Sequence, residues 1–129
     1  MTSAEPPPSL IVVNPAGAGP VILSCPHAGR FYPPELLRIS GRSVEELRQL
    51  EDAHMDALVL AAAASDMPAV IAGHARAWLD INRHPEEIDP AMIDPFPAPS
   101  QRHSSARIAA GLGLLPSRVG GRAGYPARP

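Results

Sequence analysis

Residues 21–29 read VILSCPHAG, an apolar segment that runs directly into a proline, a histidine and a glycine. The first five residues are predicted to form a β-strand, because a short apolar run bounded by turn residues is typical of a buried strand. Gly29 permits a close turn of the backbone. His27 is therefore predicted to lie at the exit of a strand, where α/β proteins carry their sites.

The segments around this stretch predict an alternation of strands and helices. Further strands are predicted at residues 10–13 (LIVV), 69–72 (AVIA) and 76–81 (RAWLDI), and short helices at 35–38 and 104–110. The order strand, helix, strand indicates an α/β fold, with a partial mixed or mostly parallel sheet and flanking helices.

A long helix is predicted over residues 43–64. Ser43 and Glu46 have the spacing of a capping box, which marks the start of a helix. The residues that recur at helical spacing are Val44, Leu47, Leu50, His54, Leu58 and Ala61. This stripe is predicted to be the buried face of the helix.

Size and composition restrict the class of protein. A chain of 129 residues fits one small domain, predicted at residues 10–116 between a flexible tail at 1–9 and a poorly ordered tail at 117–129. The formal net charge of −2 gives no basic surface for nucleic acid. The longest apolar run, residues 57–64, is too short for a membrane span of about 20 residues. The start of the chain has no signal-peptide pattern, so we expect a cytoplasmic protein.

His27 is the first candidate for chemistry. A histidine at a strand exit can bind a metal through one ring nitrogen while a neighbouring group holds the other; the alternative is a polar loop histidine. Cys25 is the only cysteine, so no internal disulfide is possible. Its position two residues before His27 on a strand allows a thiol–imidazole pair, although a lone cysteine at the end of an apolar strand is more often a small buried side chain.

An acidic cluster in the predicted long helix is the second candidate. Glu51 falls at the edge of the apolar stripe, and Asp52 and Asp56 share the polar flank beside it. A carboxylate near a buried face needs a partner, which a metal or an arginine would supply. The alternative is a solvated acidic flank, with His54 as a core histidine.

The third candidate is RAWLDINR, residues 76–83. In a strand, Arg76, Trp78, Asp80 and Asn82 would share one face. Arg83 has a planar fork suited to a carboxylate, Asn82 can add an amide donor, and Asp80 can brace either side chain. We interpret the segment as a site for an anionic small molecule; the alternative is a salt-bridge network that fastens a loop.

Five segments together resemble the N-formylglutamate amidohydrolase family. They are PHAG (26–29), EDAHMDAL (51–58), RAWLDINR (76–83), PEEIDPAM (85–92) and AAGLGLLP (109–116). Their order and spacing agree with the family over residues 10–116. The resemblance implies a fold like that of zinc carboxypeptidases and aspartoacylases. It also implies hydrolysis of N-formyl-L-glutamate, or a similar N-acyl amino acid, to formate and glutamate, as in histidine breakdown.

The resemblance also implies roles for residues of this chain. His27 corresponds to a Zn²⁺ ligand, and Glu51 or Asp52, with Asp52 preferred, to a carboxylate ligand or a bracing group. Asp80, Asn82 and Arg83 resemble the element with which aspartoacylases hold the substrate carboxylate. Arg76 opens the same segment without a distinct role.

Members of the family continue into a second half, with another histidine ligand and a general acid/base carboxylate. This chain ends at Pro129, where that half would begin, and we assign no catalytic residue within it. We therefore expect a truncated family member with weak zinc binding and little activity. The alternative is a non-catalytic module that binds a carboxylate through Asn82 and Arg83.

Overall fold

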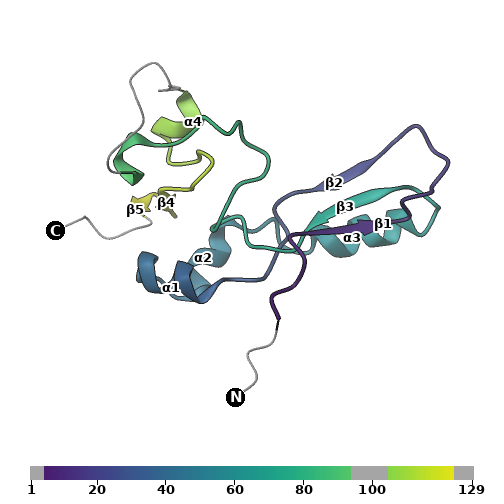
Figure 1. The fold of residues 1–129 in the computed structure, drawn as a ribbon, viewed down its shortest axis with the longest axis horizontal. Coiled ribbons are helices and arrows are strands. Elements are labelled where there is room, and N and C mark those ends of the chain that lie inside the picture. Colours follow the sequence, from purple (N-terminus) through teal and green to yellow (C-terminus); the bar gives the residue numbers. More distant parts are fainter. Residues whose placement is uncertain (1–4, 94–104, 124–129) are drawn as a thin grey trace. The chain divides into compact units, whose positions relative to one another are not determined.

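The computed structural model describes residues 5–93 and 105–123, which fall into two compact units (Figure 1). One unit combines the chain up to Phe31 with residues 51–75, and the other combines residues 32–50 with the chain from Arg76 onward. Residues 1–4 and 124–129, at the ends of the two predicted tails, lie outside the described residues.

The first unit is built on a three-stranded sheet in the order β1-β3-β2. Its strands are β1 (Leu10–Val13), β2 (Leu23–Cys25) and β3 (Ala69–Ala72). β1 runs antiparallel to β3, whereas β2 runs parallel to it. The sheet is therefore mixed, as the sequence predicted, and its central strand is β3, with the sequence AVIA.

Helix α3 (Met55–Ala63) packs against β2 and β3. Val59 and Ala63 are its buried residues, and their spacing of four places them on one face of the helix. They join the core of this unit, whose other buried members are Cys25, Ala28, Ala69 and Ile71.

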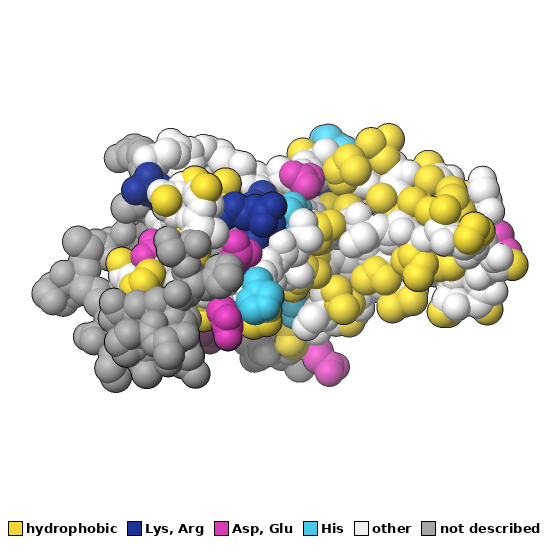
Figure 2. Space-filling model, turned by 90° about the horizontal axis from the view of Figure 1, so that it is seen from above, with side chains coloured by type: hydrophobic (Ala, Val, Ile, Leu, Met, Phe, Trp, Pro, Cys, Tyr) yellow, Lys and Arg dark blue, Asp and Glu magenta, His cyan; other side chains and the backbone are white. Residues whose placement is uncertain are grey.

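The surface of this unit is rich in apolar side chains. Figure 2 shows hydrophobic side chains spread over the part of the molecule that the strands form. The large apolar residues exposed here are Leu10, Ile11, Val12, Val21, Ile22, Met55, Leu58 and Leu60.

The second unit consists of short elements. They are α1 (Pro34–Ser40), α2 (Val44–Leu47), the 3-10 helices η1 (Arg48–Leu50) and η2 (Pro90–Met92), α4 (Ala106–Ala109), and the antiparallel strands β4 (Arg118–Val119) and β5 (Arg122–Ala123). The core consists of Leu36, Leu47, Leu50, Ala77 and Val119. The predicted short helices at 35–38 and 104–110 correspond to α1 and α4. Residues 118–123, expected to be poorly ordered, form the β4–β5 pair.

The predicted long helix at 43–64 is wrong as a single element. Its start is right, because Ser43 and Glu46 form the capping box. Helical structure then ends at Leu50 and resumes at Met55, after His54 in a left-handed conformation (φ 65°). Leu47 and Leu50 belong to the core of the second unit and Val59 to the core of the first, so the two parts of the predicted helix serve different units. His54 and Leu58, predicted on the buried stripe, are exposed.

The predicted strand at 76–81 is also wrong, because this segment forms turns after β3 ends at Ala72. The side chains of residues 76–82 therefore do not alternate across a sheet, and Trp78 is exposed. Among the described residues, no helix is long and apolar enough to cross a membrane.

Candidate functional site

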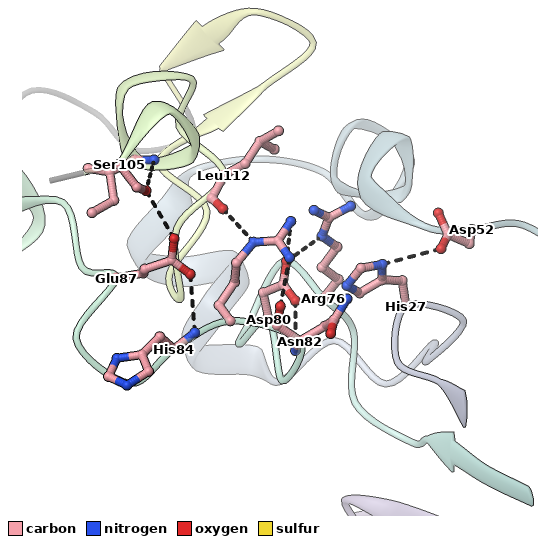
Figure 3. Close-up of polar contacts among 11 residues, drawn as sticks. His27, Asp52, Arg76, Asp80, Asn82, His84, Glu87, Ser105 and Leu112 are labelled. Atoms are coloured by element: carbon pink, nitrogen blue, oxygen red, sulfur yellow. Dashed lines mark hydrogen bonds and ion pairs between the residues drawn. The ribbon is translucent and has the colours of Figure 1, made fainter. Parts of the chain in front are cut away.

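His27 and Asp52, 25 residues apart in sequence, lie together in the first unit. His27 follows β2 and is 8% exposed. Its Nδ1 lies 3.2 Å from Oδ2 of Asp52, and the N–H of Asp52 donates to the carbonyl oxygen of His27 over 3.0 Å. Figure 3 shows the two side chains pointing toward one another. The break in the predicted helix thus has a structural role, since the N–H of Asp52 binds the His27 turn instead of a helical carbonyl.

The other predicted residues of the acidic cluster have separate surroundings. Asp56 pairs with Arg30 through Oδ1 and Nη2 at 2.9 Å, so its partner is an arginine. His54 is exposed at the start of α3 and is not a core histidine. Glu51 is half-buried.

Cys25 is buried next to this cluster. Its burial, followed by the negative charge of Asp56, raises the pKa of the thiol above its ordinary value. A raised pKa lowers the fraction of the thiol that is present as thiolate, which is the nucleophilic form. The environment therefore favours a packing role for Cys25 over the thiol–imidazole pair.

Gly29 fixes the turn after His27 against the end of β3. A Cβ at this position would collide with the backbone carbonyls of His74 and Ala72. The close turn that the sequence predicted at Gly29 thus brings the chain against its own backbone. It sets the path of the turn that carries His27.

Asp80 is the centre of the polar network in the second unit. Its side chain is fully buried; Oδ2 accepts from Nε of Arg76 at 2.9 Å and lies 3.5 Å from Nη2 of Arg83. Oδ1 accepts from the N–H of Asn82 at 3.0 Å. The structure therefore joins the side chains of Arg76 and Arg83 and the backbone N–H of Asn82 through the buried carboxylate of Asp80, and not through one face of a strand.

Glu87 is a buried carboxylate that the sequence reading did not single out. Hydrogen bonds from the N–H of His84 and then from the hydroxyl of Ser105 hold the pKa of Glu87 below its usual range. A signal was present: His84, Pro85 and Glu87 have the order of a helix start, with proline first and glutamate reaching back to the N–H three residues earlier.

A catalytic zinc site has three protein ligands and one position for water or substrate. Within residues 5–93 and 105–123, no group of three or more His, Cys, Asp or Glu side chains is arranged to hold a metal ion. The pair His27 and Asp52 supplies two donors.

Comparisons with known proteins point to the same family that the five quoted sequence segments resemble. Residues 19–129 match the protein family described as N-formylglutamate amidohydrolase. The solved N-formylglutamate amidohydrolase of Ralstonia eutropha JMP134 is similar at 30% identity and a TM-score of 0.75, over 92% of this chain and 41% of that one. No curated protein sequence matches. The family match extends over most of the sequence, and the backbone agrees with a solved member. The chain therefore belongs to the N-formylglutamate amidohydrolase family.

Proposed function

We propose that this chain carries part of a site that hydrolyses N-formyl-L-glutamate, or a similar N-acyl amino acid, on a zinc-carboxypeptidase-like fold. Water adds to the formyl carbon and the amide C–N bond breaks, which gives formate and glutamate. The observation that carries the proposal is the buried imidazole of His27 beside the half-exposed carboxylate of Asp52.

The two side chains fit a Zn²⁺ ion. Nitrogen and oxygen ligands at about 2.0–2.2 Å in tetrahedral geometry are about 3.4 Å from one another. The 3.2 Å between Nδ1 of His27 and Oδ2 of Asp52 is close to that separation. Asp52 can equally brace the ring by accepting from Nδ1–H while the other ring nitrogen faces the metal.

A Zn²⁺ ion bound by these residues would supply Lewis-acid chemistry toward the formyl carbonyl and the attacking water. His27 and Asp52 hold and orient it. The proposed partner is a small anionic substrate. In the second unit, the guanidinium of Arg83 and the amide of Asn82 would hold its carboxylate, while Asp80 braces Arg83 and Arg76 pairs with Asp80.

Calorimetric titration of the purified chain with zinc chloride tests the metal site. Two donors predict weak binding, which His27→Ala abolishes and Asp52→Asn weakens. His54→Asn is the matched control, because His54 is exposed nearby and Asn tolerates its left-handed backbone. Binding that survives His27→Ala in a folded variant would refute the site.

Formate release measures the reaction itself. We expect a rate far below that of a longer family member assayed beside it, because the described residues hold no group of three or more side chains arranged to bind a metal ion. An equal rate would contradict this expectation. Metal-independent binding of glutamate that Arg83→Ala abolishes would instead favour the carboxylate-binding module.

A further inference from the structure

The guanidinium of Arg83 is oriented by a segment far along the chain. Its Nε donates to the carbonyl oxygen of Leu112 at 2.9 Å, and its Nη1 donates to the carbonyl oxygen of Asn82 at 2.7 Å. The side chain is 10% exposed. Because Nε lies in the plane of the guanidinium, the position of Leu112 sets the direction of the whole fork.

The carboxylate of Glu87 bridges His84, the residue after Arg83, and Ser105, at the start of α4 (Figure 3). Oε2 accepts from the N–H of His84 at 3.2 Å, which fixes the turn directly after Arg83. Oε1 accepts from the hydroxyl of Ser105 at 3.0 Å. Ser105 caps α4 by accepting from the N–H of Ile108.

Helix α4 links Ser105 to Leu112. The N–H of Leu112 donates to the carbonyl oxygen of Arg107 at 2.8 Å. Two residues later, Leu114 donates its N–H to the carbonyl oxygen of Glu87 and accepts from the N–H of Asp80. Gly113 passes too close to the Glu87 carbonyl to leave room for a Cβ. The Glu87 side chain therefore fixes the turn after Arg83. Its backbone carbonyl fixes Leu114, two residues after Leu112, whose carbonyl oxygen accepts from Arg83.

We propose that Glu87 is a positioning residue for Arg83: its carboxylate joins the turn after Arg83 to the start of α4, and so sets the fork that receives the substrate carboxylate. The substrate part of this inference rests on the proposed function. The positioning part concerns Arg83 alone and can be measured without any ligand.

The test compares Glu87→Ala with Glu87→Gln. Alanine removes both acceptors. Glutamine keeps the bridge, since its amide oxygen can accept from the His84 N–H and its amide nitrogen can donate to the Ser105 hydroxyl. Ser117→Ala is the control, because the Ser117 hydroxyl fastens the same segment to Asp89 at a different point.

The first readout is the exchange of the Arg83 Nε proton with water, followed by NMR and assigned by the signal that Arg83→Lys removes. We expect Glu87→Ala to accelerate exchange about tenfold, the factor expected when a hydrogen bond to a charged group is lost. Glu87→Gln and Ser117→Ala should leave the rate near that of the parent chain. The second readout is glutamate affinity by calorimetry, which we expect Glu87→Ala to lower and Glu87→Gln to restore.

An unchanged exchange rate in folded Glu87→Ala would overturn the inference. If that variant does not fold, Ser105→Ala, which removes one arm of the bridge, takes its place with the same criterion. Faster exchange in a chain whose parent form binds no glutamate would keep the positioning role and reject the carboxylate role of Arg83. The two failures are thus distinguishable.

Discussion

Asp80 and Asp56 show how differently two aspartates can depend on their arginines. Asp80 is fully buried and faces Arg76 and Arg83, whereas Asp56 is partly exposed and pairs with the exposed Arg30. Removing one partner of a buried pair leaves an uncompensated charge, while an exposed pair is already solvated. The two carboxylates should therefore contribute very different free energies to folding.

We expect Asp80→Ala to lower the free energy of unfolding by about 3–5 kcal/mol, because it removes the negative charge that faces the poorly solvated Arg76 and Arg83. Asp56→Ala, the control, should cost about 0–1 kcal/mol. Urea denaturation followed by circular dichroism measures both. Equal losses in the two variants would mean that the Asp80 network is solvated.

Some of the predicted residues lie in one short segment, whereas His27 and Asp52, 25 positions apart, were assigned to one site from the family resemblance. Asp80, Asn82 and Arg83 lie within four residues, so their association follows from the sequence. Leu112 was not found, because the contact Arg83–Leu112 joins residues 29 positions apart. The contact Glu87–Ser105, 18 positions apart, was not found either, although the order of His84, Pro85 and Glu87 was a local signal for Glu87. Backbone carbonyls also carry no residue-type signal, so Leu112 had no pattern to reveal it.

At the scale of elements, local signals were reliable and long-range ones were not. The capping box at Ser43 and the strands at 10–13 and 69–72 depend on neighbouring residues, and the structure has all three. The helix at 43–64 failed because its two parts bury side chains in different cores. Helical spacing alone cannot reveal which core a residue joins.

The capping box permits a prediction for α2. The hydroxyl of Ser43 accepts from the N–H of Glu46, and the Glu46 carboxylate accepts from the N–H of Ser43. Ser43→Ala should therefore lower the free energy of unfolding by about 1 kcal/mol. Ser65→Ala, at an exposed serine in the turn after α3, is the control and should be nearly neutral. A neutral Ser43→Ala in the same urea series would show that α2 does not need its cap.

At the scale of the whole molecule, the first unit, which holds the three-stranded sheet, combines a small core with a large apolar surface (Figure 2). α3 shows the contrast in two consecutive residues, since Leu58 is 63% exposed and Val59 is 8% exposed. Apolar surface of this extent promotes association between molecules. We therefore expect the purified chain to self-associate at high concentration.

Leu58→Glu should reduce this association, seen as lower light scattering and weaker binding of a hydrophobic dye. It should leave the unfolding midpoint nearly unchanged, because Leu58 contributes little to the core. Val59→Glu is the matched variant one position away. It buries an unpaired charge against β2 and β3 and should unfold the unit. If Leu58→Glu lowered stability as much as Val59→Glu, then Leu58 would be covered in solution and this face of α3 would be an interface.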